Sequence, residues 1–543
     1  MRGHERATVE PADQPSRSPL PWLAAALLLL IATIAVRWPG VVMHDSIEQY
    51  GQALTGDYDD WHPPIMARTW ALLNHVHAGS GPFFLIQMAL WWGGLGLLAA
   101  ALGRQGRHKA AALVLLVGVV PLWLGWATVV LKDAQMACCL VMAAGLAALD
   151  PPPQGEGGVA ADSDMPGACR SREAGSRSEP WRRSRWWRGI PARIGALHRE
   201  GDTPPSSLRD VTSPFRGGLI VVLILYATLV RGNAAFATVP FALALFDWGG
   251  LRRWPARIAT LLVLTAAVLA ASGPINRGLL GAERSHVERF LPFYDLVGIA
   301  HFAPLATLPG LAPGQWAEAE RRRCYTPFYW DSYGDPAECG FISDALETED
   351  DRHGGILRTW ANTVVHHPVA YAHHRIVQLN ANLRFWVGPN ESSAVPPLYS
   401  EGNALGLGEP PVAAARALTD SAALMAASPL GWPILWFALA LGLLWASRGD
   451  GRQIRLGRAL ALSTVCMSAS FAVVSLASDL RYHLWSMVAA ALALILLADA
   501  RALDRRRTIA AGGILLALTA IAVAGHAGLA PPVYQPQPMP ARS

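Results

Sequence analysis

Five carboxylates stand within sixteen residues, shortly after the first apolar stretch of the chain. They are Asp45, Glu48, Asp57, Asp59 and Asp60. The spacing of three and four residues predicts that Asp45, Glu48 and Gln52 share one face of a short helix. A carboxylate beside an apolar membrane surface is well placed to abstract a proton, because a low dielectric raises its basicity. An ordinary solvated acidic loop is the alternative.

The chain has only two lysines, Lys109 and Lys132, and the second stands where it could bind an anion. It lies in Leu131-Lys132-Asp133, at the start of an apolar stretch. An ammonium group at a membrane surface is a good point-charge partner for a lipid phosphate. The alternatives are an ion pair between Lys132 and Asp133, or a lysine that only extends from a helix end toward the headgroups.

Two arginines lie at the ends of other apolar stretches. One is in Val230-Arg231-Gly232-Asn233, and the other is in Asp479-Leu480-Arg481-Tyr482-His483. An ionisable residue between membrane helices is a candidate for a functional site by default. Asp479 and Arg481 could also do no more than stabilise the start of a helix, with the carboxylate at the positive N-terminus.

Aromatic and charged residues gather between Arg321 and Tyr333. This mixture suits contact with sugars or lipid headgroups, and it also suits an aromatic belt at the membrane interface. Four histidines, His366, His367, His373 and His374, suggest a metal, but residues at these spacings cannot all share one helical face. We therefore predict no metal ligands. A divalent metal cofactor is possible but is not required by the sequence.

Several common nucleotide and metal motifs are missing from the sequence. It has no phosphate-binding loop, dinucleotide glycine fingerprint, Cys-x-x-Cys pair or His-Glu-x-x-His helix. Their absence argues against a nucleotide-driven or zinc-dependent mechanism.

The elements that must position these residues are membrane helices. Of 543 residues, 52% are hydrophobic and 16% are charged, which is too apolar for an ordinary soluble chain. Runs of about 20 apolar residues can cross a bilayer. We predict an all-α polytopic membrane protein with about eleven such helices: 20–36, 83–102, 110–126, 129–149, 219–230, 234–246, 258–272, 430–446, 460–477, 484–498 and 509–524. Arg37-Trp38-Pro39 follows the first run, so we expect an anchor and not a cleaved signal.

Basic residues near the ends of the runs predict the orientation, because such residues stay on the cytoplasmic side. With a cytoplasmic N-terminus, every strongly basic short connection falls inside. These connections contain Arg104, Arg107 and Lys109; Arg252, Arg253 and Arg257; Arg448, Arg452, Arg455 and Arg458; and Arg501, Arg505, Arg506 and Arg507. The carboxylates of the first loop, Lys132, Arg231 and Arg481 all fall on the opposite side.

This topology predicts six regions. They are a membrane module (1–149) with an external first loop (37–82), a disordered basic cytoplasmic insert (150–214), membrane helices (215–273), an external domain (274–429), C-terminal membrane helices (430–527) and an external tail (528–543). We interpret the basic insert as a solvated segment that is attracted to anionic lipid, with a specific partner site as the alternative, and we expect no nucleic acid partner. Cys324 and Cys339 are the only two cysteines in the external domain, and we expect them to form a disulfide in an oxidising compartment.

The first loop resembles the opening of the C-type superfamily of membrane glycosyltransferases, in its protein mannosyltransferase and aminoarabinose transferase branch. The likeness rests on Asp45 shortly after the first span, a Gly-x-Tyr at Gly56 to Tyr58, and His62-Pro63-Pro64-Ile65 ahead of the second span. The family often has Asp-Glu where this chain has Asp45-Ser46. Leu131-Lys132-Asp133, Arg231 with Asn233, and Arg481-Tyr482 are similar to other segments of these enzymes. The likeness covers roughly the first 150 residues and, loosely, the tenth span.

The resemblance implies an inverting transferase at the outer face of a bacterial inner membrane. A sugar would move from a polyprenyl-phosphate carrier to a glycan, lipid or protein acceptor. Asp45 would be the general base, Lys132 with Arg231 or Arg481 would hold the carrier phosphate, and Asp60, His62 and Tyr482 would orient the loop or the acceptor. A glycolipid transporter and a non-catalytic envelope assembly protein are the alternatives, although the charges gather at one face and no repeat between halves is evident.

Overall fold

The computed structural model describes residues 18–149 and 212–531, apart from residues 252, 304–307, 309, 336, 354 and 391–392. Twenty α-helices and no β-strand lie in this part of the chain. The predicted insert falls outside the described residues except for 212–214, which begin a helix. The predicted tail also falls outside them, except for 528–531.

Among the helices of the described ranges, seven are long and apolar enough to cross a membrane. They are α1 (Leu20–Arg37), α4 (Gly81–Arg104), α7 (Lys132–Leu149), α10 (Trp254–Pro274) with its continuation to Leu279, α18 (Arg452–Val474), α19 (Leu484–Asp499) with the turn before it from Leu480, and α20 (Arg505–Gly528). The pair α5 (His108–Val119) and α6 (Pro121–Ala127) adds an eighth if it is one bent span. The protein is thus a multi-pass α-helical membrane protein.

The prediction of eleven spans differs from this count in four places. Three of the predicted spans correspond to shorter apolar helices, α8 (Thr212–Leu229), α9 (Ala235–Leu245) and α17 (Pro433–Ala446). The predicted span 110–126 is broken by a bend of 60° between α5 and α6. Pro121 causes the bend, since proline has no amide hydrogen and the residue before it, Val120, leaves the helical region with ψ 118°.

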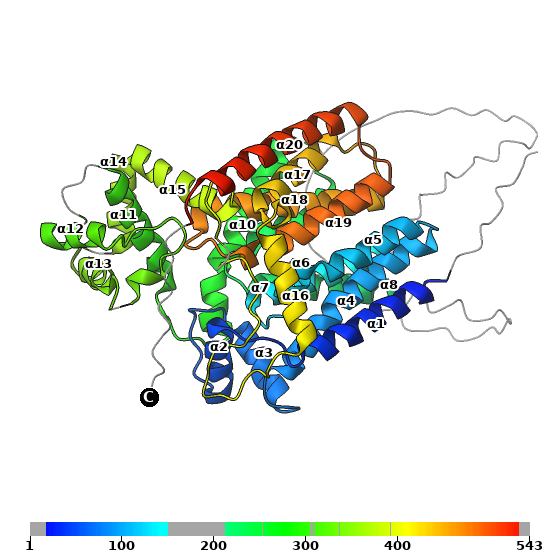
Figure 1. Cartoon of the computed structure of the whole chain (residues 1–543), viewed down its shortest axis with the longest axis horizontal. Coiled ribbons are helices and arrows are strands. Elements are labelled where there is room, and N and C mark those ends of the chain that lie inside the picture. Colours follow the sequence, from blue (N-terminus) through cyan, green and yellow to red (C-terminus); the bar gives the residue numbers. More distant parts are fainter. Residues whose placement is uncertain are drawn as a thin grey trace, which may run out of the picture. The chain divides into compact units, whose positions relative to one another are not determined.

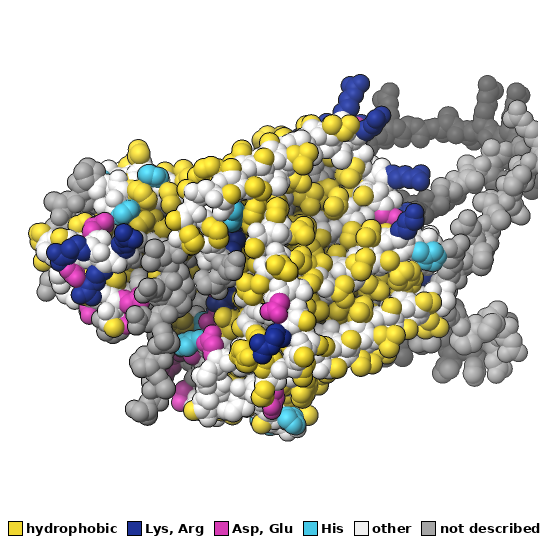
Figure 2. Space-filling model, in the orientation of Figure 1, with side chains coloured by type: hydrophobic (Ala, Val, Ile, Leu, Met, Phe, Trp, Pro, Cys, Tyr) yellow, Lys and Arg dark blue, Asp and Glu magenta, His cyan; other side chains and the backbone are white. Residues whose placement is uncertain are grey.

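Polar contacts bring together three of the four basic connections that are predicted to be cytoplasmic. Arg107 Nη1 lies 2.6 Å from Asp499 Oδ2, and Arg452 Nε donates to Ala147 O at 3.0 Å. Between the two ends, the visible face of the helices is mostly hydrophobic, as Figure 2 shows. These three basic connections therefore lie at the same end of the helices, as the sequence predicts for them.

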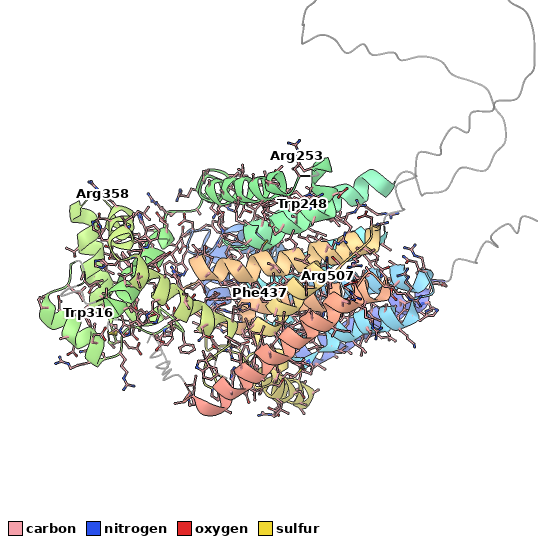
Figure 3. All side chains as sticks on the ribbon, turned by 90° about the horizontal axis from the view of Figure 1, so that it is seen from above. Trp248, Arg253, Trp316, Arg358, Phe437 and Arg507 are labelled. Carbon is pink, nitrogen blue, oxygen red and sulfur yellow. A yellow bond between two sulfur atoms is a disulfide. The ribbon has the colours of Figure 1, made fainter. Side chains whose placement is uncertain are left out.

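The helices differ strongly in how far they are buried. The spans that include α7 and α19 are each 78% buried by the rest of the protein, whereas those of α10 and α20 are only 6% and 11% buried. Figure 3 shows α10 along one edge of the bundle, near Arg253, and α20 crossing the near face of the bundle from Arg507. The central helices α7 and α19 begin at Lys132 and just after Arg481, so the two most enclosed spans carry the candidate phosphate ligands.

A small helical domain follows α10 and has its own hydrophobic core. It contains α11 (Phe290–Phe302), α12 (Pro313–Arg321), α13 (Gly340–His353), α14 (Ile356–His366) and α15 (Pro368–Leu383), which gather at one end of the molecule in Figure 1. Phe293, Leu296, Ile342 and Leu346 are buried in this core. A disulfide joins Cys324 and Cys339. The remaining helix of the predicted external domain, α16 (Ala413–Ala426), packs instead against α6.

Candidate functional site

The first loop folds into two short helices, α2 (His44–Thr55) and α3 (Ile65–Asn74). Helix α2 ends at Gly56, whose φ of +82° is a conformation that glycine adopts at little cost. Just before α2, Val41 pairs with Val129 in an isolated bridge, and Val130 N donates to Val41 O at 2.8 Å. This pairing sets the start of α2 beside the start of α7.

Asp45 lies in the first turn of α2, among three nitrogen-bearing side chains. Its Oδ2 atom is 3.1 Å from Lys132 Nζ and 3.5 Å from Arg481 Nη1, and its Oδ1 atom is 4.0 Å from His62 Nε2. The Asp45, Lys132 and Arg481 side chains are between 11% and 19% exposed, so water can still reach the group. The structure therefore brings the predicted base and two predicted phosphate ligands into one cluster.

His62 connects this cluster to a second carboxylate. Its Nδ1 atom is 2.6 Å from Lys132 Nζ, and its Nε2 atom is 3.4 Å from Glu48 Oε2. An ammonium group can only donate, so Nδ1 is the acceptor and the imidazole proton is on Nε2, facing the carboxylates. Burial and the charge of Lys132 lower the pKa of His62, which keeps the ring neutral. The predicted face of α2 is confirmed in so far as Asp45 and Glu48 both meet His62.

The expectation that a low dielectric makes Asp45 strongly basic is wrong for this arrangement. Burial does raise the pKa of Asp45, but attraction to Lys132, Arg481 and His62 outweighs it and holds the pKa well below the ordinary aspartate value. A hydrogen bond from His62 likewise lowers the pKa of Glu48. Asp45 is therefore ionised and held by cations.

Arg231 takes a different partner from the other two cations. It forms an ion pair with Asp133, which is 2% exposed, and its Nε atom donates to Asn233 Oδ1 at 2.6 Å. Its guanidinium carbon lies 4.4 Å from the centre of the Tyr482 ring. The suggested pair between Lys132 and Asp133 is thus replaced by one between Arg231 and Asp133.

The ring of Tyr482 contacts the guanidinium groups of both Arg231 and Arg481. The guanidinium of Arg481 lies 5.4 Å from the same ring, on which Arg231 also packs. Arg481 Nε is 3.0 Å from Asp479 Oδ2, so the pair suggested as a helix-start lock is present. Arg481 Nη1 also faces Asp45. The same arginine therefore pairs with Asp479 at the start of the helix and with the candidate base.

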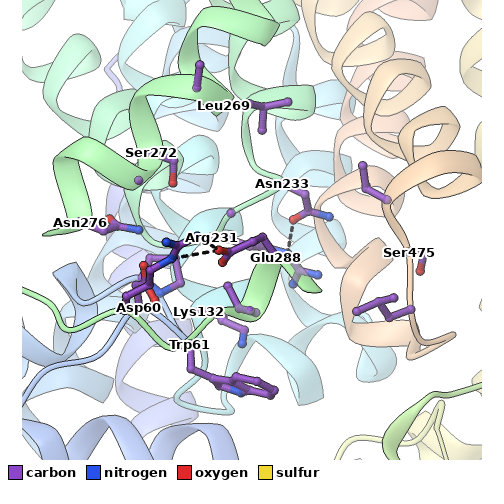
Figure 4. Close-up of a pocket in the computed structure, with 18 of the residues that line it drawn as sticks. Asp60, Trp61, Lys132, Arg231, Asn233, Leu269, Ser272, Asn276, Glu288 and Ser475 are labelled. Atoms are coloured by element: carbon purple, nitrogen blue, oxygen red, sulfur yellow. Dashed lines mark hydrogen bonds and ion pairs between the residues drawn. The ribbon is translucent and has the colours of Figure 1, made fainter. Parts of the chain in front are cut away.

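A cavity of about 620 Å³ adjoins the cluster. Its cationic and aromatic lining includes Lys132, Arg231, Tyr482, Trp61 and Trp330, and its apolar lining comes from α10 and from the end of α18: Leu269, Ala270, Phe471, Val474 and Leu476. Figure 4 shows Lys132 and Arg231 at this cavity, with Leu269 and Ser272 on α10 and Ser475 on the segment after α18. One cavity thus combines positive charge with an apolar wall on a poorly buried helix.

Asp60 fixes the first loop to the chain that follows α10. Its Oδ1 atom accepts hydrogen bonds from Ser285 N at 2.7 Å and Ser285 Oγ at 2.8 Å, while Arg277 Nη1 lies 3.1 Å from its Oδ2 atom. The backbones also pair, since Glu283 N donates to Tyr58 O at 2.7 Å. Asp60 lines the cavity, but its contacts are those of a residue that positions the loop.

The four histidines of α14 and α15 are spread over different surroundings. His374 is fully buried and bonds to Asp295 and Tyr325, whereas His367 is half-buried and His366 and His373 are exposed. Within the described residues no group of three histidine, cysteine or acidic side chains could hold a metal ion. The structure therefore offers no metal ligand set in that part of the chain.

Three residues of the site were not singled out from the sequence. The sequence suggests Asp133 only as a partner of Lys132, and Trp330 only as one member of the aromatic and charged group from Arg321 to Tyr333, which suits either sugar or headgroup contact or an interface belt. It does not suggest Arg277. The signal for Arg277 was weak but present, because it is the only charged residue in the ten positions after Ser272. The sequence does not predict the contact between Trp61 and Trp330, because the two residues come from distant segments of the chain.

The chain matches no known protein-family model, no curated protein and no solved structure. The likeness to C-type glycosyltransferases accordingly rests on the short sequence motifs alone.

Proposed function

We propose that the protein is a membrane glycosyltransferase that moves a sugar from a polyprenyl-phosphate carrier to a hydroxyl acceptor at the outer face of a bacterial inner membrane. The observation that carries the proposal is the contact of Asp45 with Lys132 and Arg481 beside a cavity that has an apolar wall. A carboxylate, an anion site and a lipid-facing surface are the three parts that such a transfer needs.

The cavity suits an anionic lipid head with an apolar tail. Lys132 and Arg231 line it on one side and offer donors to phosphate oxygens. Leu269 and Ala270 line it from α10, a helix that the protein hardly covers. A prenyl chain could therefore reach the cavity directly from the bilayer, between α10 and α18.

Because Lys132 and Arg481 contact Asp45, binding of the donor phosphate to these cations would change the basicity of Asp45. Lys132 and Arg481 are paired with Asp45, which makes this carboxylate a weak base. A phosphate that binds these cations competes with Asp45 for them, and the carboxylate then becomes more basic. Proton abstraction would thus become favourable only once the donor is in place.

The proposed transfer needs only Asp45 as the base and the three cations that bind the phosphate. Asp45 takes the proton of the acceptor hydroxyl as its oxygen forms a bond to the anomeric carbon from the face opposite the phosphate. The bond from that carbon to the phosphate oxygen breaks with its electron pair, and configuration is inverted. The carrier leaves as a phosphate monoester with one more negative charge, which Lys132, Arg231 and Arg481 stabilise.

Transfer assays in proteoliposomes test the assignment. Radiolabelled polyprenyl-phosphate sugars would be the donors, and envelope extract from a deletion strain would supply the acceptor. We expect Asp45→Asn to reduce transfer about 10²- to 10⁴-fold, the range for loss of a general base. Lys132→Ala should weaken donor use as well. Asp57→Asn, an exposed carboxylate in the same loop, and Lys109→Ala, the other lysine, are the matched controls. Full activity of both site variants would refute the proposal.

A further inference from the structure

Two tryptophans from distant parts of the chain meet at the edge of the cavity. Trp61 follows Asp60 in the first loop, and Trp330 belongs to the small helical domain. Their ring centres lie 5.9 Å apart at an angle of 47°, and both line the cavity with partly exposed side chains. Figure 4 shows Trp61 near Lys132 in this close-up.

Phe290 supports both tryptophans. Its ring centre lies 4.8 Å from that of Trp61 and 4.6 Å from that of Trp330. Phe290 does not line the cavity, so it supplies the packing that holds the first loop against the small helical domain. The two indoles, by contrast, keep part of their surface at the cavity, where a ligand can reach it.

Polar groups surround these indoles on the same cavity. Asp60, Glu288 and Asn276 line it with carboxylate and amide groups. A sugar ring has an apolar face of C–H groups and a rim of hydroxyls, so it matches an aromatic surface bordered by such acceptors and donors. A prenyl chain alone would have no use for these polar groups. Asp60 and Glu288 are paired with Arg277 and Arg284, which line the same cavity, so the carboxylates do not oppose a phosphate there.

We propose that Trp61 and Trp330 form a stacking platform for a sugar ring. This inference rests on the proposed function and adds the residues that recognise the carbohydrate. The ring belongs either to the carrier-linked donor or to a glycan acceptor, and the chemistry of recognition is the same for both. Lys132 and Arg231 on the same cavity would hold the phosphate while the platform holds the ring.

Binding measurements on the full chain in lipid nanodiscs separate the two sources. The ligands are decaprenyl phosphate, decaprenyl phosphate carrying mannose, glucose, N-acetylglucosamine or arabinose, and soluble trisaccharides of the same sugars. We expect at least one sugar-bearing ligand to bind more tightly than its sugar-free counterpart, and Trp61→Ala and Trp330→Ala to lose about 3- to 10-fold of that affinity, with decaprenyl phosphate unchanged. A loss confined to carrier-linked sugars identifies the donor, and a loss on trisaccharides identifies a glycan acceptor.

Controls keep the platform separate from folding and from the phosphate site. Trp330→Phe should stay within about threefold of wild type because it keeps an aromatic face. Trp254→Ala, at a 71% exposed tryptophan at the start of α10, should change nothing. Equal affinity for the bare carrier and every sugar-bearing ligand, with no trisaccharide bound, would overturn the platform and leave the proposed function standing. No binding of decaprenyl phosphate or its glycosides would instead refute the proposed function.

Discussion

At the scale of single residues, the candidate site is dominated by the choice of partner for each buried charge. Asp45 faces Lys132 and Arg481, and Asp133 faces Arg231. A charge removed from water is tolerated only with such a partner, because the desolvation penalty is several kcal/mol per ion. The pairs therefore hold the site together before any ligand binds.

The pair of Arg231 and Asp133 gives a stability prediction. Asp133→Asn keeps the shape of the side chain but leaves the buried guanidinium without a counter-charge. We expect the free energy of unfolding to fall by about 3 to 5 kcal/mol, measured as a lower melting temperature in detergent. The double variant Asp133→Leu/Arg231→Met should recover most of the loss, because no unpaired charge remains. A melting temperature of Asp133→Asn equal to that of the exposed-site control Asp57→Asn would contradict the prediction.

His374 gives a prediction on pH. Its Nε2 atom is 3.0 Å from Asp295 Oδ1, and its Nδ1 atom accepts from Tyr325 Oη at 2.9 Å. Burial lowers the pKa of His374, so the unfolded chain binds a proton more readily than the folded one. Stability is then complete above about pH 6.5, the ordinary histidine value, and is lost as the pH falls toward the folded pKa, by at most about 1.4 kcal/mol per pH unit.

Melting curves of the full chain at pH 8 and pH 5 test this sign. The difference between the two melting temperatures should shrink in His374→Gln, because the group that titrates is gone. His373→Gln changes the exposed neighbouring histidine and should leave the difference as in wild type. The same response in both variants would show that His374 does not carry the dependence.

At the scale of elements, the first loop and the end of α10 act as one unit. The chain passes through a π-helical turn from Ile275 to Leu279, and Asp60 then binds Ser285 and Arg277. Turns of this kind often occur at functional sites. Since α10 is otherwise poorly buried, this attachment is what fixes the wall of the cavity.

Hydrogen exchange can measure that attachment. Asp60→Ala removes the acceptor of the Ser285 amide, and a hydrogen bond to a charged group contributes about 1.5 to 3 kcal/mol. We expect amide exchange in residues 283–285 to become about 10- to 100-fold faster. Asp57→Ala, in the same loop but exposed, should have no such effect. Unchanged exchange in Asp60→Ala would mean that the backbone pairing with Tyr58 is sufficient.

The sequence predicted what is local in these elements and missed what depends on distant segments. An apolar run is a local property, so every predicted span has a helix, although Pro121 bends one of them. The alternation of the helices was enough to place Asp45, Lys132, Arg231 and Arg481 at one end. Which charges pair depends on the contact of Val41 with Val129, and no local pattern encodes that contact.

At the scale of the whole molecule, the two ends differ in chemistry. One end carries the Asp45 cluster and the cavity, and the other carries the basic connections around Arg107 and Arg452. Basic residues near span ends are retained in the cytoplasm. The site should therefore face the outside, where donor sugars arrive on lipids and nucleotide sugars are absent.

Labelling of single cysteines in intact cells tests this orientation. The background for these variants carries Cys169→Ser and Cys466→Ala. It retains the disulfide, and its remaining free cysteines, Cys138 and Cys139, are buried and should react little with the label. We expect Asp57→Cys to react with a membrane-impermeant maleimide within minutes, and Gln105→Cys, at the exposed end of α4, to react only after permeabilisation. The reverse pattern would put the Asp45 cluster on the cytoplasmic side. Soluble nucleotide sugars could then reach the cavity, and a lipid-linked donor would no longer be required.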